Sequence, residues 1–211
     1  MTARTPTATH RVGATRRAAR SRTLTRRRRV GGILGALALL VVGVALLSPM
    51  FHHAVEEITL PLRHEDIIRQ QAREKGLDPA LIAAVIYAES RFVLGRTSPA
   101  GAEGLMQITP DTAAGIAKRS GGTRFVVDDL HTPQVNIAYG SYLLRELLQR
   151  YDGNVVAALA AYNAGPGKAD EWGGANLKAS QIPYAETRHY VQKVLDARDE
   201  YRRRYKRELG L

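Results

Sequence analysis

Residues 81–107 read LIAAVIYAESRFVLGRTSPAGAEGLMQ, and this stretch decides the fold of the chain. Its first eight residues are apolar and recur at helical spacing, which predicts a buried helix. Glu89 lies three and four residues after Ile86 and Val85, so its carboxyl group ends the apolar face. Loss of water and the negative end of the helix dipole both disfavour a charged carboxylate there. We therefore expect a raised pKa at Glu89, which suits a general acid working near neutral pH.

Glu89 has a second interpretation on periodicity alone, as a helix-end glutamate turned to solvent, because charged side chains are mostly exposed. The segment that follows favours a site instead. The apolar periodicity stops near Phe92, and residues 95–104 carry three glycines and Pro99, which predicts a loop. Such a loop can fold back across Glu89 and present backbone groups and Gln107 to a bound ligand.

Three blocks of the sequence resemble the signature of the soluble lytic transglycosylases, a family in the clan of goose-type lysozyme. The blocks are ESRF with SPAGAEGLMQ (89–92 and 98–107), AYNAGPG (161–167) and PYAETRHYV (183–191). They follow one another in the family's order, which is a more specific signal than one short motif. The resemblance implies an all-α, lysozyme-like catalytic domain, which we place at residues 63–207, with a sugar-binding cleft between two lobes.

The resemblance also implies the chemistry. Glu89 would protonate the leaving oxygen of the β-1,4 bond between N-acetylmuramic acid and N-acetylglucosamine in peptidoglycan. The substrate's own N-acetyl group would stabilise the developing cation. The Glu89 carboxylate would then take the proton of the C6 hydroxyl, giving a 1,6-anhydro product without water. Such an enzyme is a lyase that needs no cofactor and no second carboxylate.

Six further positions match substrate-binding residues of the family. Ser98 matches a serine that contacts the N-acetyl group, Glu186 matches a second acid in the cleft, and the others match the cleft floor and the surroundings of the acid. Each has an alternative structural role: a tyrosine in an Ala-rich helix is usually core, the glutamine can bond to its own loop, and Glu186 can pair with Arg188. The expected substrate-binding residues are Ser98, Met106, Gln107, Tyr162, Asn163 and Glu186.

The sequence departs from the family pattern at two places. Val93-Leu94 stands where the family often has Asn-Pro, and Thr132 stands where an Asp often precedes the proline. The first departure puts the initial turn of the loop in doubt, and neither touches the acid.

The N-terminal 62 residues have a different character. Residues 1–29 hold ten arginines, no acid and almost no large apolar side chain, which predicts a disordered basic tail. Residues 30–51 are apolar and long enough to cross a bilayer, for which about 20 residues are needed. The positive-inside rule then keeps the tail in the cytoplasm. We expect a single-pass signal anchor in the plasma membrane, a tether at 52–62 and an extracytoplasmic catalytic domain.

Two alternatives apply to this region. A signal peptide cleaved after Ala45 would give a secreted protein, although the apolar run continues past that residue. An arginine-rich arm can also bind nucleic acid. We expect no nucleic-acid partner, because the arginines run directly into the apolar span and membrane topology explains them. The net charge of +11 belongs to this tail, since the other 182 residues hold 21 basic and 20 acidic side chains.

The composition also limits the kinds of functional site that the chain can form. The chain has no cysteine, which excludes disulfides, thiolate metal sites and cysteine nucleophiles. It has no phosphate-type glycine loop, so we expect neither metal nor nucleotide, and we expect a monomer. A hydrolytic muramidase of the same fold and a non-catalytic wall-binding protein remain as alternative functions.

Periodicity and capping residues predict the other helices. We expect helices at about 62–75, 110–118, 133–151, 155–164 and 183–206, with a helix start at Asp78-Pro79 before the central one. Residues 169–181 look like a loop, with Trp172 as a lid over the core rather than a ligand platform. Phe125 to Val127 could form a short strand, although nothing else resembles a partner strand.

Overall fold

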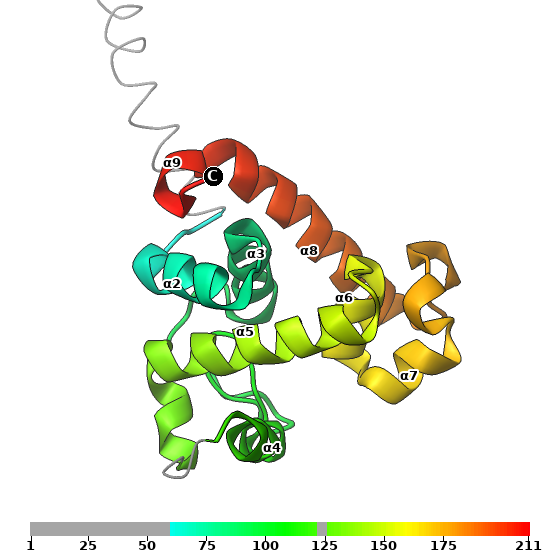
Figure 1. Cartoon of the computed structure of the whole chain (residues 1–211), viewed down its shortest axis with the longest axis horizontal. Helices are drawn as coiled ribbons and strands as arrows, with labels where there is room; N and C mark the ends of the chain where they lie inside the picture. Colours follow the sequence, from blue (N-terminus) through cyan, green and yellow to red (C-terminus); the bar gives the residue numbers. More distant parts are fainter. Residues whose placement is uncertain (1–59, 122–125) are drawn as a thin grey trace, which may run out of the picture. The chain divides into compact units, whose positions relative to one another are not determined.

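The computed structural model describes residues 60–121 and 126–211 (Figure 1). Contacts divide the chain into two units, 1–55 and 56–211, of which only the second contains described residues. The predicted basic tail, the predicted membrane span and all but the end of the predicted tether therefore lie outside the described part. Within that part, no helix is long and apolar enough to cross a bilayer.

Helix α3 (Pro79–Ser90) forms the centre of this unit and packs along α8 (Ala185–Arg204), with α2 (Glu65–Lys75) beside it. Residues 80–86 of α3 are buried without interruption, as the sequence predicts for a core helix. The predicted start is confirmed: Asp78 accepts a hydrogen bond from the amide of Ala80 at 3.0 Å, with Pro79 in the first turn. The helix ends where Arg91 and Phe92 take left-handed φ angles of 53° and 61°.

Helices α5 (Pro133–Arg150) and α6 (Val155–Ala164) pack against each other beside this pair, as Figure 1 shows. Helix α6 is a run of small residues, and residues 157–161 are all buried. The small side chains of α6 allow neighbouring helices to approach it closely. Gly140 of α5 allows a similarly close approach of Met106, because a Cβ atom at Gly140 would lie 2.4 Å from the sulfur of Met106. Helical spacing of the apolar residues predicts that Tyr142, Leu143 and Leu148 of α5 point inward, but these are only half-buried, and the buried face includes Gly140 and Leu144 instead.

Predicted capping residues begin and end several helices. Gly76 closes α2, as the sequence predicts, and Gly121, a cap not expected from the sequence, closes α4 (Pro110–Ser120); both are in the left-handed conformation. The side chain of Thr109 caps α4, and that of Asn154 caps α6. Helix α2 starts three residues later than predicted, at Glu65.

The prediction of a loop at residues 169–181 is wrong. The chain forms helix α7 (Pro166–Glu171) and the 3₁₀ turns η2 (Gly174–Asn176) and η3 (Ala179–Gln181) instead. The glycines on either side of Pro166 predict a sharp turn, but Pro166 starts α7, because its fixed φ suits a first helical position. Trp172 is half-buried against the core with its ring 5.0 Å from that of Tyr184, in keeping with a lid.

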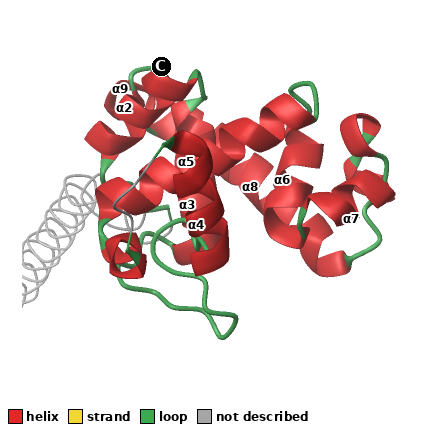
Figure 2. Ribbon diagram, turned by 60° about the horizontal axis from the view of Figure 1, so that its bottom comes forward, coloured by secondary structure: helices red, strands yellow, loops and turns green. Residues whose placement is uncertain are grey.

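The remaining differences are small. Val127–His131 forms the 3₁₀ turn η1 rather than a strand, and Phe125 lies outside the described residues. Helix α8 ends at Arg204, and a short helix α9 (Lys206–Leu209) follows. Figure 2 shows helices and loops throughout the described unit, whose β pairing is limited to isolated bridges of Glu103 with Thr97 and Ile108. The all-α prediction is therefore confirmed for the described residues.

Candidate active site

Glu89 lies in the last turn of α3, half-buried, with its carboxyl group turned towards α8. The hydroxyl of Tyr190 donates a hydrogen bond of 2.7 Å to its Oε1 atom. Burial raises the pKa of Glu89 to about 7, and this effect outweighs the Tyr190 bond and the charges of Lys193 and Arg96, which lower it. The direction expected from the sequence is confirmed. A carboxyl group with this pKa is able to give and regain a proton near neutral pH.

Two tyrosines face Glu89 from different helices. Tyr190 comes from α8 and is buried, and Tyr162 comes from α6 and donates its hydroxyl to the backbone oxygen of Met106 at 2.9 Å. Burial raises the pKa of both phenols well above their ordinary value, and a negative charge on Glu89 raises it further. Both therefore stay neutral, so neither phenol adds a charge beside the Glu89 carboxyl group.

The loop after α3 is held in place by the side chain of Asn136 in α5. Asn136 is only 1% exposed. Its Oδ1 atom accepts from the amide of Met106 at 2.7 Å, and its Nδ2 atom donates to the backbone oxygens of Glu103 and Leu130 at 2.8 and 2.9 Å. These three bonds form a clasp between Asn136 and the loop. The clasp requires a glycine at position 104, because a Cβ atom there would lie 2.2 Å from Asn136 Nδ2. The loop is thus a rigid support that carries the Tyr162 acceptor.

The predicted loop residues mainly hold the loop together. Ser98 Oγ accepts from the amide of Ala102 at 3.0 Å, which closes a tight turn. Gln107 donates through Nε2 to the backbone oxygens of Arg96 and Gly104, both at 2.9 Å, and has a left-handed φ of 48°. Met106 is fully buried, so its side chain supports the site from inside and does not line an open cleft.

The other two predicted residues are exposed. Asn163 follows Tyr162 near the end of α6, and Glu186 lies in the first turn of α8, one turn before Tyr190. Arg188 donates to the backbone oxygen of Ile182, and the ion pairs found among the described residues do not include Arg188 with Glu186. Both side chains are free to meet a ligand.

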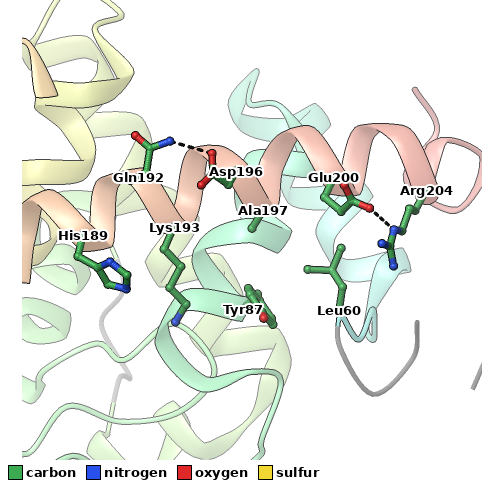
Figure 3. Close-up of a pocket in the computed structure, with 9 residues that line it drawn as sticks. All are labelled: Leu60, Tyr87, His189, Gln192, Lys193, Asp196, Ala197, Glu200 and Arg204. Atoms are coloured by element: carbon green, nitrogen blue, oxygen red, sulfur yellow. Dashed lines mark hydrogen bonds and ion pairs between the residues drawn. The ribbon is translucent and has the colours of Figure 1, made fainter. Parts of the chain in front are cut away.

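A groove of about 460 Å³ lies along α8 on the side that faces Tyr87 of α3 (Figure 3). Leu60 and Arg204 lie at one end of the groove, and Tyr87 and Lys193 lie along its length, as Figure 3 shows. Its remaining lining residues come from one face of α8: His189, Gln192, Asp196, Ala197 and Glu200. In the described part of the chain, no three His, Asp or Glu side chains gather as they would to hold a metal.

Sequence reasoning missed three residues that shape this site. Tyr190 stands inside the third family block, but only the structure shows its hydroxyl on Glu89. Asn136 is a polar residue on the buried face of α5, and a polar side chain in that position is a signal that can be read from sequence. Lys193 gives no such signal, because exposed lysines at helical spacing are common.

A family model described as "Transglycosylase SLT domain" matches residues 66–184, more than half of the chain. The soluble lytic murein transglycosylase of Salmonella typhimurium is 34% identical over 179 residues, covering 79% of this chain and 26% of that protein. The membrane-bound lytic murein transglycosylase C of Glaesserella parasuis is 29% identical over 187 residues, covering 71% of this chain and 51% of that one. The chain spans about a quarter of the length of the soluble relatives.

Solved structures agree. An inactive mutant of the lytic transglycosylase Slt from Pseudomonas aeruginosa matches with a TM-score of 0.68 at 33% identity, over 72% of this chain and 26% of that one. The 70 kDa soluble lytic transglycosylase of Escherichia coli matches with a TM-score of 0.65 at 33% identity, over 70% and 25%. A complex of the 70 kDa enzyme with bulgecin A matches at 0.66. The fold class predicted for the catalytic unit is confirmed.

Proposed function

The chain belongs to the transglycosylase SLT domain family, and on that premise we propose that it is a peptidoglycan lytic transglycosylase. It would cleave the β-1,4 bond between N-acetylmuramic acid and N-acetylglucosamine and leave a 1,6-anhydro end. The observation that carries this proposal is the state of Glu89: one half-buried carboxyl group with a pKa of about 7 and a donor bond from Tyr190.

The surroundings of Glu89 favour a mechanism with a single carboxyl group. Most glycosidases use two carboxylates on either side of the bond. Among the described residues, the groups that bond to Glu89 or shift its pKa are Tyr190, Lys193 and Arg96, and none is an acid. The substrate's N-acetyl group would then stabilise the cation at C1.

Each proton has a defined path in this mechanism. Protonated Glu89 gives its proton to the glycosidic oxygen as the C1–O bond breaks, and becomes a carboxylate. The carboxylate then takes the proton of the C6 hydroxyl, whose oxygen bonds to C1. Glu89 is protonated again, and no water is consumed. With a pKa near 7, Glu89 can act as the acid when it is protonated and as the base when it is ionised.

The predicted substrate-binding residues divide into two groups in this proposal. Asn163 and Glu186 are exposed, the first next to Tyr162 in sequence and the second one turn before Tyr190, and would contact the sugar directly. Ser98, Met106, Gln107 and Tyr162 would act mainly by holding the loop in the shape that the sugar meets.

The mass of the product tests the function. Digestion of purified peptidoglycan by the full-length protein should release fragments with anhydro ends, seen by mass spectrometry. A hydrolytic muramidase of the same fold would give fragments heavier by one water, and a non-catalytic wall-binding protein would give none. Either result would contradict the proposal.

We further propose that residues 30–51 anchor the enzyme in the plasma membrane with the catalytic unit outside. The apolar run supports this, as does the membrane-bound relative from Glaesserella parasuis. Cell fractionation should find the intact chain in the membrane pellet, resistant to extraction by high salt or alkali. A protein recovered from culture fluid with its N-terminus after Ala45 would show that the segment is a cleaved signal peptide.

A further inference from the structure

Lys193 reaches from α8 to the end of α3, where Glu89 lies. Its Nζ atom donates a hydrogen bond of 2.9 Å to the backbone oxygen of Ala88, the residue before Glu89. The ammonium group also lies 5.4 Å from the centre of the Tyr87 ring, a cation–π contact. Figure 3 shows the side chain extending from α8 towards α3, on the same side of α8 as Tyr87. Lys193 is therefore half-buried and held in place.

The bond to Ala88 satisfies an acceptor that the helix leaves open. In a continuing helix the Ala88 oxygen would accept from the amide of Phe92, four residues later. That amide bonds instead to the side chain of Ser90, at 3.2 Å, because the chain turns away. A cation suits this position, since the carboxyl end of a helix carries partial negative charge. Lys193 thus fixes the turn of backbone that carries Glu89.

The charged and titratable groups around Glu89 and Lys193 come from four parts of the chain. Tyr162 of α6 and Tyr190 of α8 are neutral. Arg96 of the loop is an exposed cation that acts on Glu89, and Arg91, just past the end of α3, is an exposed cation that acts on Lys193. Exposed charges are screened by water and salt. Lys193 differs from both arginines, because two contacts hold its charge in a half-buried position.

We propose that Lys193 is a positioning residue for the reaction at Glu89: it holds the end of α3 and supplies the fixed positive charge that favours the carboxylate form. This inference rests on the proposed function. The need for such a charge follows from the two proton transfers. When the glycosidic oxygen takes the proton, negative charge appears on Glu89 inside a poorly hydrated site, which opposes it. A fixed ammonium group lowers the cost of that step.

The test uses a neutral donor and a charged replacement. Lys193→Gln replaces the ammonium group with an uncharged amide donor on a side chain one bond shorter, whereas Lys193→Arg keeps the charge. The pKa of Glu89 is read from the carboxyl-carbon NMR signal of the full-length protein in detergent micelles, assigned with Glu89→Gln. We expect Lys193→Gln to raise the titration midpoint by about one pH unit, the effect of removing a nearby opposite charge. Lys193→Arg should leave it near the wild-type value.

Kinetics give a second readout. Because cleavage requires protonated Glu89, the alkaline limb of the pH–rate profile of Lys193→Gln should shift to higher pH, by the same one unit or so as the titration midpoint. The limiting kcat should fall about threefold to tenfold, since a weaker acid transfers its proton less readily, with little change in KM. Lys206→Gln, which removes one exposed lysine from α9, should change neither quantity.

The outcomes separate this inference from the proposed function. An unchanged Glu89 midpoint in Lys193→Gln, or an equal shift in Lys206→Gln, would overturn the role of Lys193. A Lys193→Arg variant that titrates like Lys193→Gln would do the same. The NMR titration needs no turnover, so absent cleavage by the wild type would reject the proposed function and leave this measurement valid.

Discussion

The Glu89→Gln variant should lose peptidoglycan cleavage by a factor of about 10³ or more. A positioned general acid contributes about 10² to 10⁴ in rate, and here one group would serve as acid and base in turn. The glutamine amide keeps the shape of the side chain and can still accept from Tyr190, but it cannot give a proton. Initial rates of fragment release from purified peptidoglycan measure the loss. A variant that kept a substantial fraction of wild-type activity would exclude Glu89 as the acid.

The same substitution should make the protein more stable at alkaline pH. The pKa of Glu89 is about 7 in the fold, against an ordinary value of 4.5. Between these values the folded state binds more protons than the unfolded state, so the contribution of Glu89 to stability is complete at low pH and is lost as pH rises through 7. At pH 8 the wild type therefore bears a cost of about 1–3 kcal/mol, an order of magnitude that allows for partial exposure.

Thermal unfolding at several pH values checks this prediction. Glu89→Gln should unfold at a higher temperature than wild type at pH 8, and the difference should shrink as the pH falls from 7 towards 4.5. Glu171→Gln makes the same chemical change on an exposed part of α7 and should alter neither stability nor cleavage. A Glu89→Gln protein that is less stable than wild type at pH 8 would show that the carboxylate is not destabilised by its surroundings.

The Asn136→Ala variant should be the most destabilised single substitution proposed. It leaves the amide of Met106 and the backbone oxygen of Leu130 without their partner, and the Glu103 oxygen keeps only its bond from the Ile108 amide. Each buried polar group left unpaired costs about 1–3 kcal/mol, and water can reach some of them once the side chain is gone. We expect a loss of about 3 kcal/mol or more in the free energy of unfolding, measured by chemical denaturation.

Asn136→Asp and Asn163→Ala complete that experiment. The aspartate keeps the acceptor for Met106 but loses both donated bonds, and its charge would face two backbone oxygens. Its carboxyl pKa should rise, so this variant should recover stability relative to wild type as pH falls. Asn163→Ala removes an exposed amide and should change stability by less than about 0.5 kcal/mol. Equal stability of Asn136→Ala and wild type would show that the loop does not depend on this clasp.

Local signals in the sequence predicted most of the helices. Asp78-Pro79, Gly76 and Thr109 act through bonds within a few residues, so their roles can be read without tertiary structure. The error at Pro166 has the same origin: Gly165-Pro166-Gly167 fits a turn or a helix start equally well by local rules. Packing on α6 decides in favour of α7. The face of α5 was misplaced because the glycine at 140, not a large side chain, meets the core.

The candidate site was less accessible to sequence reasoning. The apolar run before Glu89 was enough to predict the direction of its pKa shift. Its partners lie about a hundred residues away, Tyr190 through a side-chain bond and Lys193 through the Ala88 oxygen. No local pattern reveals such contacts. The alternative considered for Gln107, a bond to its own loop, is the arrangement that the structure shows.

The central claim is that one carboxyl group stays protonated near neutral pH because its surroundings are poor in water. Titration of the Glu89 carboxyl carbon in the wild-type protein measures this directly. We predict a midpoint at about pH 7, with the signal absent from Glu89→Gln. A midpoint at or below the ordinary value of 4.5 would contradict the account, because a group already ionised at neutral pH has no proton to give.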